Sequence, residues 1–233
     1  MKGILTALLK SFARACKEFD LLAEGDRVAV ALSGGKDSTS LLDLMLRYRE
    51  RAGFSYDVIA VHVVGTAAVF PDQTGVLAPW LEALGVAYRF VPLEFPPDEP
   101  LPPDCFRCSW NRRKALFLAA DALGCNKLAL GHHADDAAVT ALMNLLFTGR
   151  LETLEPKVEF FGGRITVIRP LIYIPARDLA SYARASGFPL APPCPYGRDA
   201  NRQKIEDFLR SFGPRQQAHI RANLWRAATG RCE

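Results

Sequence analysis

The sequence has no long apolar run, and this absence excludes one large class of proteins. Within its 233 residues, no stretch approaches the roughly 20 apolar residues that a membrane-spanning helix needs. The apolar residues near the start are interrupted by Lys10, Arg14 and Lys17, so they predict an amphipathic helix within residues 1–25 and not a signal peptide. We therefore expect a cytoplasmic protein without a membrane partner.

A large excess of charge is also absent. The net charge is +4, and all of this excess lies after residue 197, where eight basic residues accompany four acidic ones. The preceding part of the chain has 21 residues of each sign. A basic tail fits a surface for a phosphate backbone, and it fits an ordinary solvated helix equally well.

The spacing of a Walker A loop is missing, but another glycine-rich stretch follows an apolar run. Residues 33–38 read Ser33-Gly34-Gly35-Lys36-Asp37-Ser38 and precede a helical pattern over 37–51. Consecutive glycines, serines and the free amides of a helix start suit a phosphate, and the lysine adds positive charge. The aspartate fits when a divalent cation accompanies the phosphate. The stretch predicts a phosphate site with Mg²⁺, and the alternative is a simple turn between a strand and a helix.

Strand and helix patterns alternate along most of the chain. Strands are expected at 28–32, 58–64, 87–91 and 127–130, and helices at 37–51, 75–84, 109–123 and 135–147. A strand pair at 158–168, a helix at 176–185 and one or two basic helices follow. This order predicts an α/β fold with a doubly wound, mainly parallel sheet and helices on both faces. The expected parts are the helix of 1–25, a nucleotide-binding domain of 26–190, and a tail of 191–233 packed on it.

A second motif, Gly131-His132-His133-Ala134-Asp135-Asp136, also lies where a strand leads into a helix. We expect it at the same edge of the sheet as the first loop, so that both meet over one ligand. Gly131 permits close approach to a nucleotide, and Asp135 or Asp136 could hold a metal ion or polarise a leaving group. Helix capping by an aspartate is the alternative, and the histidines are weaker candidates.

The third motif is the C-x-x-C pair Cys105 and Cys108, for which no second C-x-x-C exists. Such a pair suits a zinc half-site, an iron-sulfur site or a redox dithiol. Cys194, which lies among prolines, is the natural third ligand. Three thiolates suit a 4Fe-4S cluster with one iron free of protein ligands, and zinc is the alternative. The remaining cysteines are expected to be buried apolar residues or uninvolved: Cys16, Cys125 and Cys232.

Taken together, these motifs resemble the tRNA 2-thiocytidine synthetase family of PP-loop ATP pyrophosphatases. The resemblance covers about residues 28–210 and includes Arg112-Arg113 after the C-x-x-C, Arg169-Pro170-Leu171 and the late Cys194. It implies an enzyme that adenylates the C2 oxygen of a cytidine in the tRNA anticodon loop and replaces this oxygen with sulfur. ATP, Mg²⁺ and a 4Fe-4S cluster are the implied cofactors. The implied partners are tRNA and a sulfur donor, with a homodimer as one possible assembly.

The resemblance also implies a role for individual residues. Ser33, Gly34, Gly35, Lys36, Asp37 and Ser38 would bind the ATP phosphates and metal; His62, Gly131 and Asp135 would complete the nucleotide site; and Cys105, Cys108 and Cys194 would hold the cluster. The implied catalytic residues are Lys36, Asp37, Arg112, Asp135 and Asp136. Arg112 is expected on the first turn of a helix, where it would neutralise charge on the adenylate or on a tRNA phosphate, or be a plain surface arginine.

One departure from the family pattern leaves the substrate open. Val64 stands at the end of the second strand, where the family usually has an acidic residue, and an apolar loop at 65–69 follows it. Two other functions remain as alternatives. One is a uridine thiolase or another adenylating PP-loop enzyme, and the other is a zinc-stabilised nucleotide- or RNA-binding module without turnover.

Overall fold

The structure is a computed structural model that describes residues 2–65, 70–96, 99–192, 194 and 199–230. The loop residues 66–69 and Cys232, both considered above, lie outside this part. The described strands are β1 (Arg27–Ala31), β2 (Asp57–Val64), β3 (Ala87–Pro92), β4 (Lys127–Ala129), β5 (Lys157–Phe160) and β6 (Ile165–Ile168). The described helices are α1 (Lys2–Glu18), α2 (Lys36–Arg49), α3 (Thr74–Ala83), α4 (Cys105–Ala122), α5 (Ala134–Thr148), α6 (Ala176–Ser186), α7 (Ala200–Arg210) and α8 (Pro214–Thr229).

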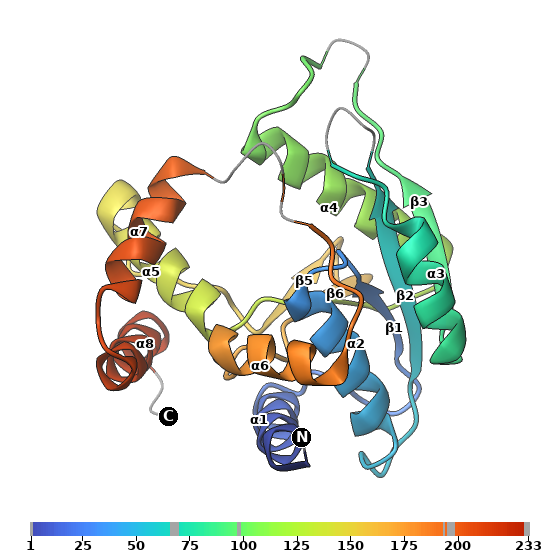
Figure 1. Cartoon of the computed structure of the whole chain (residues 1–233), viewed down its shortest axis with the longest axis horizontal. Coiled ribbons are helices and arrows are strands. Elements are labelled where there is room, and N and C mark those ends of the chain that lie inside the picture. The colour runs from blue at the N-terminus through green and yellow to red at the C-terminus, as the bar shows by residue number, and fades with distance from the viewer. Residues whose placement is uncertain (1, 66–69, 97–98, 193, 195–198, 231–233) are drawn as a thin grey trace.

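The strands form one sheet in the order β3-β2-β1-β4-β6-β5 (Figure 1). All neighbouring pairs are parallel except β5 with β6, which form an antiparallel hairpin. From β1 the chain first builds outward through β2 and β3, and it then returns to place β4 on the other side of β1. The strand order thus reverses between β1 and β4, which is where open α/β sheets bind their ligands. The expected doubly wound sheet is confirmed.

Both faces of the sheet are covered because side chains alternate along each strand. Val28 and Val30 of β1 belong to the apolar core that includes residues of α1, α2, α3 and α6. Ala29, between them, belongs to a second core that includes Ala119 and Ala120 of α4. Figure 1 shows α4 on the side of the sheet away from α2 and α6.

The amino-terminal edge of the sheet is held by a buried ion pair. Lys127 Nζ lies 2.5 Å from Asp26 Oδ2 and donates to the carbonyl oxygen of Leu21 at 2.7 Å. Asn126 Nδ2 donates to the other oxygen of Asp26 at 2.8 Å. These contacts join β4 to the loop before β1, at the end of the sheet opposite the glycine-rich loops.

The start of α4 differs from the prediction. The helix expected at 109–123 begins at Cys105, because the Asp104 side chain accepts a hydrogen bond from the Arg107 amide at 2.7 Å and caps the helix. The C-x-x-C pair therefore occupies the first turn of α4. Arg112 lies in the third turn, so its expected place on the first turn is wrong.

Among the described residues, no helix has both the length and the apolar character to cross a membrane.

Candidate functional site

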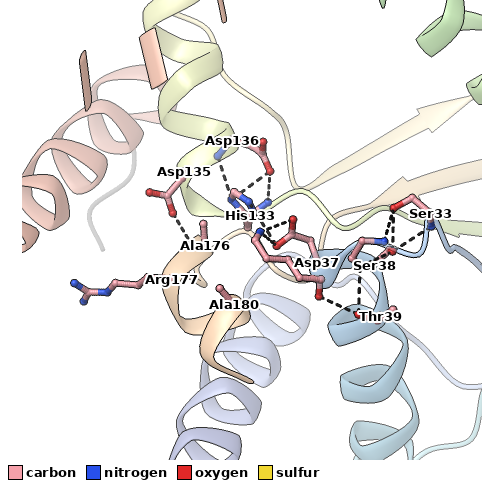
Figure 2. A network of polar contacts seen from close by, with 12 residues as sticks. Ser33, Asp37, Ser38, Thr39, His133, Asp135, Asp136, Ala176, Arg177 and Ala180 are labelled. Atoms are coloured by element: carbon pink, nitrogen blue, oxygen red, sulfur yellow. Dashed lines mark hydrogen bonds and ion pairs between the residues drawn. The ribbon is translucent and has the colours of Figure 1, made fainter. Parts of the chain in front are cut away.

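The loop between β1 and α2 is a compact turn held by its own serines. Ser33 and Ser38 place their hydroxyl oxygens 3.0 Å apart, and Ser38 Oγ also accepts from the Ser33 amide at 3.1 Å. Gly34 has a φ of +78°, a backbone conformation that side-chain-bearing residues rarely adopt. The turn presents the amino-terminal end of α2, which begins at Lys36, toward the centre of the site (Figure 2).

The second motif packs directly against this turn. A Cβ atom added to Gly131 would lie 3.3 Å from the carbonyl carbon of Asp37 and 3.3 Å from the amide nitrogen of Ser38. Only a glycine lets the two backbones approach so closely without displacement. The expectation that the two loops meet at one edge of the sheet is therefore confirmed.

His133 connects the acidic residues of the two loops. Its Nδ1 accepts a hydrogen bond from the Asp136 amide at 3.3 Å, while Asp136 Oδ2 accepts from the His133 amide at 3.0 Å. These two bonds form a capping box at the start of α5. Because Nδ1 accepts, the ring proton lies on Nε2, which points toward Asp37 Oδ1 at 3.7 Å. From the sequence, the histidines are weaker candidates for the functional site. The spacing of three residues between His133 and Asp136 is the signal that predicts this cap.

Two arginines from the C-terminal helices reach the aspartates of α5. Arg221 Nη1 of α8 lies 2.9 Å from Asp135 Oδ1, and the Ala176 amide donates to Asp135 Oδ2 at 2.7 Å. Arg202 of α7 forms an ion pair with Asp136. In the sequence, both arginines are members of a basic tail and nothing more. No local motif marks them, since each contact joins residues more than sixty positions apart.

Charged neighbours also determine which protonation states the site holds. Burial alone would raise the pKa of the Asp136 carboxyl, but the neighbouring imidazole rings, the hydrogen bond from the His133 amide and the guanidinium of Arg202 lower it, so this group is ionised at neutral pH. Burial lowers the pKa of His132, whose Nδ1 accepts a hydrogen bond from Arg169 Nε at 3.2 Å. His132 is therefore neutral and helps to support the loop.

A pocket of about 490 Å³ lies beside these loops, and His133, Asp135, Asp136, Arg202 and Arg221 are among the residues that line it. The first residues of α2, α5 and α6 contribute to its wall, and so do residues of α7 and α8, which pack beside α5 (Figure 1). Its basic lining residues are Lys36, Arg177, Arg202, Arg210 and Arg221. Its acidic lining residues are Asp37, Asp135, Asp136 and Glu206. Cations and helix starts suit phosphate groups, and neighbouring carboxylates suit a divalent metal, so the lining fits a metal-bound polyphosphate.

His62 holds the residue that precedes the phosphate loop. Its side chain is buried in β2, and its Nδ1 donates to the Leu32 carbonyl oxygen at 2.8 Å. Burial lowers its pKa, so the ring is neutral. His62 thus fixes the residue that precedes Ser33, and its expected contact with a nucleotide stays a prediction.

The three candidate cluster ligands lie near one another. Cys105 and Cys194 are exposed and Cys108 is half-buried. Burial raises the pKa of the Cys108 thiol, the charge of Arg112 opposes this increase, and the thiols of Cys194 and Cys105 add to it. Such mutual influence requires proximity, although no group of three or more His, Cys, Asp or Glu residues within the described chain already has a metal-binding arrangement. Three neighbouring thiols are a donor set that fits an iron-sulfur cluster or zinc. Cys16 and Cys125 are buried, as expected.

One segment connects the cysteines with the phosphate loop. Residues 188–192, here called the crossing segment, pass over this loop, and the Ala191 amide donates to the Gly34 carbonyl oxygen at 2.8 Å. Cys194 follows only three residues later, which limits its backbone to about 10 Å from this contact. The third cysteine is therefore adjacent to the phosphate loop.

Comparison with known proteins identifies the family that carries this combination. The PP-loop domain family matches residues 6–66. A tRNA-cytidine(32) 2-sulfurtransferase from Alkalilimnicola ehrlichii is 41% identical over 230 residues, which cover 94% of this chain and 73% of that protein. The chain belongs to the tRNA-cytidine(32) 2-sulfurtransferase family. A second member, from Anaeromyxobacter sp. strain K, is 38% identical over 227 residues, which cover 94% of this chain and 77% of the relative.

A solved structure extends the comparison to another thiolase. The chain is similar to the U34-tRNA thiolase NcsA from Methanococcus maripaludis with its [4Fe-4S] cluster, with a TM-score of 0.72 and 25% identity. The match covers 93% of this chain and 77% of NcsA. The predicted PP-loop fold, the family and the enzyme class, a tRNA sulfurtransferase, are confirmed. The roles predicted for individual residues stay predictions.

Arg112 occupies a central position in this sulfurtransferase-family chain. Its guanidinium carbon lies 4.9 Å from the centre of the Phe70 ring. Burial raises the pKa of Cys108 and lowers that of His62; the charge of Arg112 opposes the first shift and adds to the second, so Arg112 lies near both residues. Val64, the departure from the family pattern, is the last residue of β2 and pairs with Pro92 of β3.

Proposed function

We propose that this chain is an ATP-dependent tRNA thiolase that adenylates the C2 oxygen of an anticodon-loop cytidine and replaces this oxygen with sulfur. The observation that carries the proposal is the crossing segment, which contacts the phosphate loop at Gly34 and brings Cys194 beside it. This contact supports a site in which the phosphate loop activates a nucleotide beside the three thiols. The names of the relatives support tRNA as the substrate and cytidine as the nucleoside.

The activation step uses the pocket described above. Ser33, Gly35 and the amino-terminal end of α2 would bind the ATP phosphates, with Lys36 as the local cation. Asp37 and Asp135 have the oxygen ligands that Mg²⁺ prefers and would hold it there. The base oxygen attacks the α-phosphorus, the bond to the bridging oxygen breaks, and pyrophosphate leaves with that electron pair.

The second step replaces the activated oxygen. Cys105, Cys108 and Cys194 would hold the 4Fe-4S cluster, which when bound supplies an iron without a protein ligand that can carry sulfide. Sulfide attacks C2, the bond between C2 and oxygen breaks, and the oxygen leaves as part of AMP. Arg112 would support both stages: its positive charge favours the thiolate of Cys108, and it would neutralise negative charge on the adenylate or on a tRNA phosphate.

Residues beside the cysteines suit an unstacked RNA loop. Phe106 and Trp110 lie one turn apart on α4, with 68% and 44% of their side chains exposed. Arg107 and Lys114 place their charged groups 5.7 Å and 5.8 Å from the Trp110 ring centre. Aromatic faces next to cations bind single-stranded bases, and loop nucleotides can leave their stack at low cost.

The cluster is tested on protein prepared without oxygen. We expect iron and sulfide in a ratio near that of one 4Fe-4S cluster, with broad visible absorbance. Replacement of Cys108 by alanine should remove both. Cys125 is a buried cysteine three residues past the end of α4, so Cys125→Ala should keep them. Zinc in place of iron, together with no tRNA-dependent pyrophosphate release, would support a binding module without turnover and contradict the proposal.

A further inference from the structure

We infer that Arg202 and Arg221 bind the pyrophosphate part of ATP and stabilise it as the leaving group. The C-terminal helices α7 and α8 would thereby supply two catalytic residues to the nucleotide site. This inference rests on the proposed function, because it assigns residues to the leaving group of the same adenylation step.

The first argument is the position of the two side chains. Both line the pocket of about 490 Å³, and Lys36 and Asp37 of the phosphate loop line the same pocket. The side chain of Arg221 is only 11% exposed and that of Arg202 is 33% exposed, so both are partly withdrawn from solvent where they line the pocket. A phosphate chain that begins at the loop and extends into this pocket reaches both arginines.

The second argument is the pattern of charge pairs in the pocket. Asp37 pairs with Lys36 at 2.6 Å, Asp135 pairs with Arg221 at 2.9 Å, and Asp136 pairs with Arg202. A metal-bound pyrophosphate offers a new partner to both members of each pair, since the carboxylates can turn to the metal and the cations to the phosphates. Guanidinium groups suit this exchange because they bind phosphate oxygens through two parallel hydrogen bonds.

The third argument is that α8 does not need these ion pairs to stay attached. Trp225 of α8 is buried, and its ring centre lies 6.3 Å from that of Phe19 and 5.8 Å from that of Tyr173. Apolar packing therefore attaches the helix to the body of the fold. Partly buried ion pairs contribute little net stability, because removal of the charges from water offsets their attraction. A ligand-binding role explains why two such pairs face one cavity.

During adenylation, the bond between the α-phosphorus and the bridging oxygen breaks, and its electron pair stays on that oxygen. The departing pyrophosphate then carries one more negative charge. Hydrogen bonds from Arg202 and Arg221 to the pyrophosphate oxygens become stronger as this charge develops, which lowers the barrier. No proton or electron has to be supplied from elsewhere.

The inference is tested by titration calorimetry of inorganic pyrophosphate and of AMP, both in a buffer that contains Mg²⁺. Arg202→Met and Arg221→Met should each weaken pyrophosphate binding at least tenfold and leave AMP binding within about twofold, because AMP lacks the departing phosphates. Arg226→Met is the matched control on α8. Its guanidinium is exposed and donates to Asn223 Oδ1 at 2.7 Å, so pyrophosphate affinity should not change.

A double variant separates a direct contact from a change in charge. Loss of Arg221 also removes the ion-pair partner of Asp135, whose negative charge then repels pyrophosphate. If the arginine contacts the phosphates, Asp135→Asn combined with Arg221→Met stays weak, and Arg221→Lys recovers part of the affinity. Full recovery in the double variant, equal weakening of pyrophosphate and AMP, or no pyrophosphate binding by the unsubstituted protein would overturn the inference. None of these titrations needs tRNA, so failure to thiolate tRNA is a separate result.

Discussion

Substitution of Gly34 by alanine separates two costs that the structure assigns to this one position. Gly34 has a φ of +78°, and an alanine there pays about 1–2 kcal/mol for the left-handed backbone. Its new Cβ would also lie 3.0 Å from the Cβ of Ala191, below the 3.5–4.0 Å of a normal carbon contact. Overpacking of this kind costs about 1–3 kcal/mol. We expect the free energy of unfolding to fall by about 2–5 kcal/mol in total.

Two further variants isolate these costs in urea unfolding. Gly25 has a φ of +77° and nothing within 4 Å of an added Cβ, so Gly25→Ala should show the backbone cost alone. In a background that carries Ala191→Gly, the contact is absent, and Gly34→Ala should then cost no more than Gly25→Ala. ATP affinity should recover in the same background. An equal cost for Gly34→Ala with and without Ala191 would refute the close contact between the crossing segment and the phosphate loop.

Three other variants test the stability and charge of the described residues. Lys127→Met should lower the free energy of unfolding by about 3–5 kcal/mol in urea melts, since it leaves the buried Asp26 without its cation. Arg112→Met should slow alkylation of Cys108 near neutral pH, because loss of the positive charge raises the pKa of the thiol further; faster alkylation would contradict the assigned geometry. His132 has a pKa below its ordinary value of 6.5, so acidification protonates the unfolded chain first and stability falls. His132→Gln should therefore reduce the loss of stability between about pH 7 and pH 5, and an unchanged slope would count against a neutral, buried ring.

The fold was predictable because its signals are local. Strands such as 28–32 are short apolar runs, and each is followed by a helical pattern, which specifies a parallel sheet wound in two directions. The two glycine-containing motifs could also be placed together, since both follow strands and the carboxyl ends of parallel strands share one edge. The close approach at Gly131 is the physical outcome of that arrangement.

The other half of the site was not predictable from such signals. Arg202 and Arg221 reach Asp136 and Asp135 across 66 and 86 residues of sequence, and their charge alone does not tell whether they face solvent or a pocket. The start of α4 was also missed. The proline-rich segment before it suggested an irregular connection, and the capping role of Asp104 places the C-x-x-C pair in a helix instead.

The central claim is tested most directly by the nucleosides that this chain produces in tRNA. Protein reconstituted without oxygen is incubated with unmodified tRNA, ATP, Mg²⁺ and sulfide, and the digested nucleosides are measured by mass spectrometry. The account predicts 2-thiocytidine with the unsubstituted protein, and none without ATP or with Cys108→Ala. A thiolated uridine in place of cytidine, or no thiolated nucleoside from cluster-loaded protein, would contradict it.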